Sequence, residues 1–277
     1  MAYPSAQPIG DVAVLMNNHC DNRCPGCIAR IPTEGERKMD ISMETLKSVV
    51  RFAEDCADVR DYKAQLTGFG EPTLNPFLMD AVGLFANSHK PPKQITLLTN
   101  GREFSKAETA ISFLGRLGAA ASGTPVLVCM SADEYHARSV GIKAVAARAR
   151  NLAAHAEENR INYEFRAGVP QHLLADAKSE KKVTKGIRKR FSLPDGGRVS
   201  LLTWTSEESQ RHPARHYPVR LVYIDYRGDV RAHFASFVKR EPPAGNVNVN
   251  TPEEIMKVIR DDEERVNAMP ASEAFRN

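Results

Sequence analysis

Short apolar runs alternate with longer amphipathic segments as far as about residue 205 of the chain. The short runs have the length and the apolar composition of buried strands, and they lie at 12–17, 62–68, 94–100, 125–131, 162–168 and 199–204. The longer segments have the i, i+3, i+4 apolar spacing of helices, and they lie at 42–57, 76–89, 105–118 and 141–159. This alternation predicts an α/β fold with a parallel sheet, either curved or closed into an incomplete barrel.

The pattern changes after residue 205. A polar stretch leads to residues 219–235, where two strand-like runs flank a Gly-Asp turn and predict a β-hairpin. A loop rich in Pro, Gly and Asn then precedes a helix that we expect to begin at Thr251-Pro252 and to end near Pro270. We therefore expect a core at 10–205 and a C-terminal hairpin and helix extension at 206–277.

Composition adds the class of protein and its expected location. The chain has 277 residues, 42% of them hydrophobic, which is enough to fill a core. We find no apolar run of about 18 residues and no signal-peptide pattern at the N-terminus, so we expect a cytoplasmic protein with no membrane partner. The net charge of +4 is too small to argue for nucleic acid without a local patch.

Three of the five cysteines lie together in "NNHCDNRCPGC", spaced C-x3-C-x2-C at Cys20, Cys24 and Cys27. Soft sulfur ligands select zinc, copper(I) or iron-sulfur clusters. Structural zinc normally takes four ligands in two separated pairs, and this chain has no second C-x2-C. His19, next to Cys20, would point elsewhere in most backbone geometries. A [4Fe-4S] cluster held by three cysteines leaves one iron open and is favoured, while a zinc-binding protein that is not an enzyme remains the alternative.

The cysteine loop follows the first predicted strand, at the carboxyl end where parallel α/β folds bind ligands. In this spacing and place it resembles the hallmark motif of the radical S-adenosylmethionine (SAM) superfamily. The resemblance implies a partial (β/α)6 TIM-like barrel over the core, one oxygen-sensitive [4Fe-4S] cluster and SAM. One departure is Gly26, where the family often has an aromatic residue.

A second motif, "TGFGEPTLNP", follows the second strand. It resembles the family's GGEP motif, with Phe69 in place of a glycine. The resemblance implies that the backbone around Gly68, Gly70 and Glu71 holds the amino group of SAM. Without the cysteines before it, the same stretch would more simply be a Gly-Pro turn with a solvated glutamate.

Polar residues at the ends of later strands complete the expected SAM site. The resemblance places SAM contacts at Thr99, Asn100 and Ser131, which are otherwise strand-end caps or turn residues. Glu164 and Arg166 share one face of the fifth strand, and Lys63, Gln65 and Thr67 share one face of the second, so we expect a polar interior. Arg166 either binds the carboxylate of SAM or forms a structural ion pair with a glutamate.

Cys129 shares a face with Ser131 and is therefore expected to point into the same cavity. A thiol in that position could donate a hydrogen atom to a substrate radical, as in an epimerase, and Cys129 is our candidate catalytic residue. The simpler interpretation is a small buried apolar side chain.

A basic run at 178–190 contains seven Lys or Arg residues. A solvated helix face is the default interpretation. The run could instead bind an acidic partner, a phosphorylated substrate or RNA, but it lacks the interleaved aromatic residues of a base-stacking surface, so nucleic acid is not the expected partner.

The C-terminal piece resembles the start of the auxiliary-cluster (SPASM or twitch-like) extension of radical SAM maturases. His233 or Phe234 stands where that extension has a cysteine, and no cysteine follows Cys129. A second cluster is therefore excluded by ligand count, and we expect the piece to form a lid or wall over the substrate cavity.

The resemblance also implies a reaction. An electron donor such as flavodoxin or ferredoxin reduces the cluster, SAM is cleaved to methionine and a 5'-deoxyadenosyl radical, and the radical takes a hydrogen atom from the substrate. We expect a peptide or a small metabolite as substrate, with an epimerase or a nucleotide-modifying enzyme as narrower alternatives.

Overall fold

The computed structural model describes residues 9–25, 27, 37–56, 62–170, 177–204, 221–232 and 241–268. Within these ranges one sheet has the strand order β6-β5-β4-β3-β2-β1-β7-β8-β9. Its strands are β1 (Asp11–Leu15), β2 (Lys63–Thr67), β3 (Gln94–Thr99), β4 (Val126–Ser131), β5 (Ile161–Pro170), β6 (Arg198–Trp204), β7 (Leu221–Ile224), β8 (Asp229–Arg231) and β9 (Gly245–Asn246). The helices are α1 (Met43–Cys56), α2 (Leu78–Ala86), α3 (Ala107–Ala120), α4 (Glu134–Val140), α5 (Ile142–Ala156), α6 (Ala177–Arg190) and α9 (Pro252–Ala268), with short 3-10 turns η2 (Pro72–Leu74) and η3 (Arg102–Phe104).

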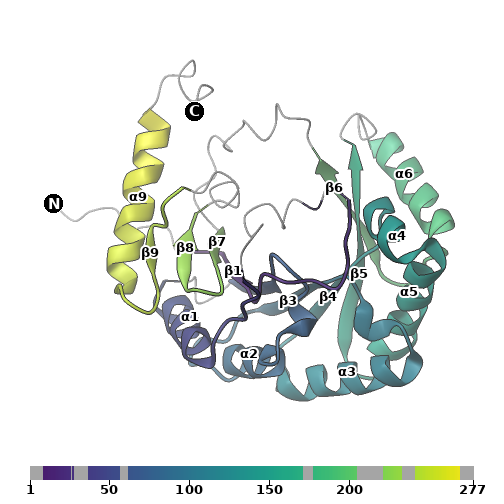
Figure 1. Ribbon diagram of the computed structural model, residues 1–277, viewed down its shortest axis with the longest axis horizontal. Coiled ribbons are helices and arrows are strands. Elements are labelled where there is room, and N and C mark those ends of the chain that lie inside the picture. The colour runs from purple at the N-terminus through teal and green to yellow at the C-terminus, as the bar shows by residue number, and fades with distance from the viewer. Residues whose placement is uncertain are drawn as a thin grey trace.

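Strands β1 to β6 are parallel and follow chain order across the sheet. The sheet curves, and helices α1 to α6 lie along its outer side, as Figure 1 shows. Each strand therefore ends at the same edge, where the loops that follow the strands come together. This is the incomplete barrel that the alternating pattern predicts.

The two faces of the barrel strands differ in polarity. The face toward the helices is apolar and buried, with Val12, Val14, Ala64, Leu66, Ile95, Leu97, Val126 and Val128. The inner face of β2 carries Lys63, Gln65 and Thr67, all half-buried, as predicted. The registers place Cys129 beside Glu164 on the same inner face. The interior of the barrel is thus polar enough to receive a polar ligand.

The C-terminal piece extends the same sheet. Strand β7 pairs in parallel with β1, and it forms the predicted hairpin with β8. Helix α9 begins at Pro252, as expected, and contacts α1. Before it, in the turn after β9, Asn248 Nδ2 donates to Thr45 Oγ1 of α1 at 3.1 Å. Gly26, His233, Phe234 and the residues from 205 to 220 lie outside the described residues, so the expected domain boundary near 205 stays a prediction.

Candidate functional site

The cysteine loop leaves the carboxyl end of β1 and lies directly on the end of β2. The Phe69 amide donates to the Asn17 carbonyl at 3.0 Å, and the Glu71 amide donates to the His19 carbonyl at 2.9 Å. His19 itself turns to Asp40, 3.0 Å from Nε2 to Oδ1, and not to the cysteines, as predicted. Backbone pairing therefore fixes the start of the loop before the first cysteine.

The two glycines of the "GFGEP" turn permit this close contact. A Cβ added to Gly70 would lie 1.8 Å from the His19 carbonyl oxygen, and one added to Gly68 would lie 2.7 Å from Asn17 Oδ1. The first is a clash with backbone, which cannot rotate away, so only glycine fits at position 70. In this structure the glycines make room for the cysteine loop.

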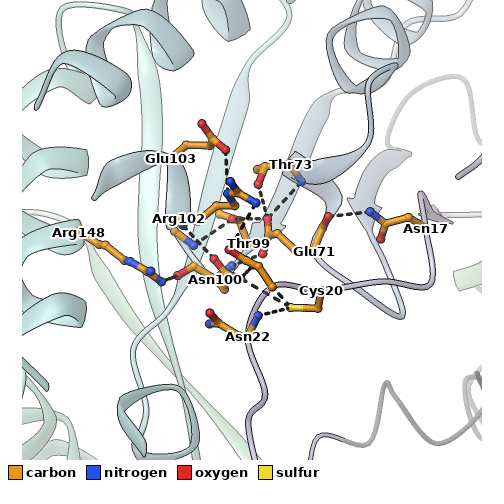
Figure 2. A network of polar contacts seen from close by, with 12 residues as sticks. Asn17, Cys20, Asn22, Glu71, Thr73, Thr99, Asn100, Arg102, Glu103 and Arg148 are labelled. Atoms are coloured by element: carbon orange, nitrogen blue, oxygen red, sulfur yellow. Dashed lines mark hydrogen bonds and ion pairs between the residues drawn. The ribbon is translucent and has the colours of Figure 1, made fainter. Parts of the chain in front are cut away.

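Glu71 joins the ends of three elements through its buried carboxylate (Figure 2). Oε1 accepts from Thr99 Oγ1 at 2.6 Å, and it also accepts from the hydroxyl and the amide of Thr73. Oε2 accepts from the Asn100 amide at 2.7 Å. Burial raises the pKa of Glu71, against the lowering effect of these four donors. The side chains of Glu71 and Thr99, both predicted to contact SAM, thus bind each other and hold β3 to η2.

Asn100 connects this clamp to the first cysteine (Figure 2). Its Nδ2 lies 3.7 Å from Cys20 Sγ and donates to Asp21 Oδ1 at 3.0 Å, and the Asn22 amide donates to the same sulfur at 3.3 Å. Arg148 Nη1 in turn donates to the Asn100 carbonyl at 3.1 Å. Cys20 is exposed as a residue, but the loss of water around its sulfur raises the pKa of the thiol to about 11. Two N–H donors beside the sulfur would favour its thiolate once a cation is bound.

The cysteine loop contacts α4, a helix that the sequence pattern did not predict. The Arg23 amide, next to Cys24, donates to Ser139 Oγ at 3.0 Å, and His136 Nδ1 of the same helix lies 2.8 Å from Asp133 Oδ1. Burial alone would lower the pKa of His136, but the influence of Asp133 and Cys24 outweighs burial and raises it to about 10. The signal for α4 was Asp133, an N-cap residue that follows β4 and accepts from the His136 amide at 2.9 Å.

The residues of the cysteine loop are the candidate ligands of a metal cluster. The Cys27 amide donates to the Cys24 carbonyl at 3.4 Å, which brings the last two cysteines into one turn. Among the described residues, no three His, Cys, Asp or Glu side chains lie close enough together to hold a metal ion. Two buried amide atoms beside the loop, Asn17 Oδ1 and Asn22 Nδ2, have no hydrogen-bond partner in the described part of the chain. Three soft sulfurs on one loop, with an unmet buried donor next to them, fit an iron-sulfur cluster in ligand type and place.

The remaining predicted residues form a second group on β4, β5 and β6. Cys129 Sγ donates to Glu164 Oε1 at 3.0 Å, Arg166 Nε donates to the same oxygen at 2.8 Å, and Ser200 Oγ donates to Oε2 at 2.9 Å. Burial alone would raise the pKa of Glu164, but these bonds outweigh it and lower the pKa. Ser131 pairs with Arg166 in the strand register. Glu164, which no motif marked, is the centre of this group.

Cys129 is only 1% exposed, and this burial is the main reason why the pKa of its thiol is strongly raised. Arg166 does form the glutamate ion pair that was one of its two interpretations, while its side chain remains 25% exposed. The structure therefore places Arg166 beside Ser131 on neighbouring strands. It buries Cys129, whose thiol donates to the Glu164 carboxylate.

The basic run forms α6, which the default interpretation expected to be a solvated helix. Arg190 binds Glu134 of α4 through two hydrogen bonds of 2.9 and 3.0 Å. Arg188 donates to the carbonyls of Pro194 and Gly197. The five lysines of this run, Lys178, Lys181, Lys182, Lys185 and Lys189, are exposed. None of the helices in the described part of the chain could span a membrane.

Comparison with solved structures supports the fold. No protein-family model and no curated protein matches the sequence. The structure of polyhistidine-tagged anSMEcpe with bound AdoMet has a TM-score of 0.61 and 16% sequence identity, covering 95% of this chain and 81% of that one. BtrN in complex with AdoMet and 2-DOIA has a TM-score of 0.48 and 14% identity, covering 95% of this chain and 87% of that one. The first of these confirms the predicted fold class, an α/β fold with a TIM-like partial barrel.

Proposed function

We propose that this chain is a radical SAM enzyme that takes a hydrogen atom from a peptide or a small metabolite. The observation that carries the proposal is the C-x3-C-x2-C loop, seated by Gly70 on the turn before Glu71 at the carboxyl edge of a parallel partial barrel. The structural neighbour anSMEcpe carries bound AdoMet on the same fold, which supports SAM as the ligand.

Cys20, Cys24 and Cys27 would hold one [4Fe-4S] cluster, and their sulfurs would converge as it binds. Such a cluster, reduced by a flavodoxin or a ferredoxin, supplies the electron that cleaves SAM to methionine and a 5'-deoxyadenosyl radical. Asn100 and the Asn22 amide would stabilise the Cys20 thiolate, because both already donate toward its sulfur.

The residues predicted for SAM divide into two roles in this proposal. The backbone around Gly68, Gly70 and Glu71 would bind the amino group of SAM, while the bond between the Glu71 and Thr99 side chains holds that backbone in place. Arg166 binds Glu164 through Nε, and its Nη groups are proposed to bind the SAM carboxylate beside Ser131. The polar inner faces of β2 and β5 would then contact the substrate.

Anaerobic reconstitution with iron and sulfide tests the metal assignment. We expect brown protein with about four irons and four sulfides per chain, lost when the three loop cysteines are replaced by alanine. A colourless protein with one zinc per chain would contradict the proposal and support the structural zinc alternative.

The epimerase alternative depends on Cys129 as a hydrogen-atom donor. Its burial and its bond to Glu164 favour a structural role instead, because the thiol hydrogen is already directed at a carboxylate. The RNA-modifying alternative depends on α6, and substrate affinity that does not change with salt would count against it.

A further inference from the structure

Phe69, the residue by which the second motif departs from the family pattern, contacts the C-terminal piece. It lies between the two glycines that bring the "GFGEP" turn against the cysteine loop, and it is only 3% exposed. Its ring meets that of Tyr226 edge to face, with 6.4 Å between the centroids and 85° between the planes. Tyr226 lies in the turn between β7 and β8, and the site as proposed above gives it no role.

Tyr226 also contacts the start of the cysteine loop. Its hydroxyl accepts from Asn18 Nδ2 at 3.4 Å. The same Asn18 side chain donates to the Arg37 carbonyl at 2.8 Å and accepts from the Met39 amide at 2.7 Å. The Asn18 amide donates to the Met39 carbonyl at 3.2 Å. Asn18 therefore joins the chain before the cysteines to the chain at 37–39, and we call this junction of Asn18, Arg37 and Met39 the neck of the cysteine loop.

The turn that carries Tyr226 is itself fixed. The Asp225 carboxylate accepts from the amides of Arg227 and Asp229. Asn246 Nδ2 of β9 donates to the Arg227 carbonyl at 3.0 Å, and the Arg227 guanidinium carbon lies 5.3 Å from the centre of the Tyr226 ring. Tyr226 is 4% exposed. A tyrosine held in this way presents an apolar ring and a polar tip in fixed directions.

One side chain thus touches both motifs at the carboxyl edge of the barrel. Its ring packs on Phe69 of the GFGEP turn, and its hydroxyl bonds to Asn18 at the neck. Edge-to-face aromatic pairs stabilise a fold beyond the area that they bury. Loss of the whole side chain should therefore loosen the turn and the neck together, whereas loss of the hydroxyl should loosen the neck alone.

We propose that Tyr226 is a positioning residue whose ring holds the GFGEP turn and whose hydroxyl holds the neck of the cysteine loop. The β7–β8 hairpin thereby supports the carboxyl edge of the barrel. That the supported turn binds SAM rests on the proposed function, whereas the support itself does not.

The test uses the full chain with three substitutions. Tyr226→Phe removes the hydroxyl and keeps the ring, Tyr226→Leu removes both, and Phe69→Leu removes the partner ring. Phe113→Leu is the matched control, because Phe113 of α3, on the outer side of the sheet, forms another buried edge-to-face pair. Its partner is Phe104, with 5.8 Å between the ring centroids.

The first readout is hydrogen exchange in the iron-free protein, measured amide by amide. The amides of Asn18 and Met39 report on the neck, and those of Phe69 and Glu71 report on the turn. We expect Tyr226→Leu to speed exchange at all four by roughly threefold to tenfold, the equivalent of one aromatic pair. Tyr226→Phe should speed exchange at the neck only, and Phe69→Leu mainly at the turn.

The control and a double variant make this readout decisive. Wild-type exchange at all four amides in Tyr226→Leu would overturn the proposal, as would an equal increase in Phe113→Leu. Exchange at Glu71 in the double variant of Phe69→Leu and Tyr226→Leu should rise by less than the product of the two single effects, because the rings act as one pair. An increase equal to that product would show that they act independently. If Tyr226→Leu does not fold, wild-type exchange at the neck in Tyr226→Phe overturns the proposal.

The second readout is 5'-deoxyadenosine formation by the reconstituted, reduced protein. A displaced GFGEP turn should weaken SAM binding, so Tyr226→Leu should raise the KM for SAM severalfold with little change in kcat, and Tyr226→Phe should return the KM toward wild type. Wild type that forms no 5'-deoxyadenosine would contradict the proposed function and leave the exchange result standing. Faster exchange in Tyr226→Leu with an unchanged KM would contradict the link between the hairpin and SAM.

Discussion

Gly70 shows how one residue without a side chain sets the site. Its Cα approaches the His19 backbone so closely that a methyl group would displace the loop that carries Cys20. The sequence suggested that the glycines let the backbone approach a ligand, but in the described structure Gly70 lets it approach the cysteine loop. The glycines and the cysteines of the two motifs are therefore coupled through packing.

Gly70→Ala should consequently lower the free energy of unfolding by about 1–3 kcal/mol, the usual cost of overpacking, and should reduce the iron retained after reconstitution. Gly186→Ala is the matched control, since a Cβ there meets nothing within 4 Å and lies inside α6. Alanine should stabilise that helix by up to about 1 kcal/mol. Urea unfolding and iron analysis measure both, and a Gly70→Ala protein with wild-type values would refute the packing argument.

Asp225 gives a pH-dependent prediction in the turn between β7 and β8. Burial, with Asp229 nearby, raises its pKa from 3.8 to about 6, while Oδ1 accepts from the amides of Arg227 and Asp229. The unfolded chain releases this proton at lower pH than the folded chain, so this group's contribution to stability falls as pH rises from about 4 to about 6.

Asparagine at position 225 keeps the Oδ1 acceptor and cannot ionise. The stability of Asp225→Asn relative to wild type should therefore increase by up to about 3 kcal/mol between about pH 4 and about pH 7, the value of a shift of about two pKa units. Urea unfolding at both pH values measures the difference. A difference that is the same at both would show that Asp225 ionises normally in the folded chain.

At the scale of elements, Glu164 links β4, β5 and β6 by accepting from Cys129, Arg166 and Ser200. Cys129→Ser keeps a donor to this carboxylate and should change the free energy of unfolding by less than about 1 kcal/mol. Cys129→Val removes the donor and should cost about 1–3 kcal/mol, because a buried acceptor loses a partner.

Urea unfolding of the two Cys129 variants separates the structural role from the catalytic one. If both variants lose the same stability, the bond to Glu164 contributes nothing. If both fold like wild type but give product of changed stereochemistry, Cys129 is the hydrogen-atom donor after all.

The elements that the sequence predicted are those whose signal is local. All six barrel strands and the hairpin are found within about four residues of their predicted ends, because short apolar runs mark the strands and the Gly-Asp turn marks the hairpin. Helix α4 has only seven residues, fewer than two turns, so its period could not be recognised. The hydrogen bond from the Arg23 amide to Ser139 Oγ joins two distant segments of the chain, and no local pattern predicts it.

At the scale of the whole molecule, the C-terminal piece continues the barrel sheet beyond β1. Asp11 is in register with Lys63 on one side and with Leu221 on the other. A hairpin can be predicted from its turn, but the strand beside which it lies depends on contacts across the whole chain. The sequence predicted the fold class and the hairpin, whereas the position of β7 beside β1 required the structure.

Three loops meet at the carboxyl edge of the barrel sheet. The cysteine loop, the Glu71 turn and Asn100 come from the ends of β1, β2 and β3, and they contact one another in one polar network (Figure 2). Such a network at the carboxyl edge of a parallel sheet is where a bound ligand is expected. The central claim is that the ligand is SAM and that the chain cleaves it.

The most direct test of that claim is formation of 5'-deoxyadenosine from SAM by the reconstituted, chemically reduced protein without oxygen. We predict 5'-deoxyadenosine and methionine in equal amounts from wild type and from Cys56→Ala, whose cysteine lies in α1 outside the loop. None should form when Cys20, Cys24 and Cys27 are all alanine. Iron-loaded wild type that forms no 5'-deoxyadenosine, or formation that persists in the triple variant, would contradict the account.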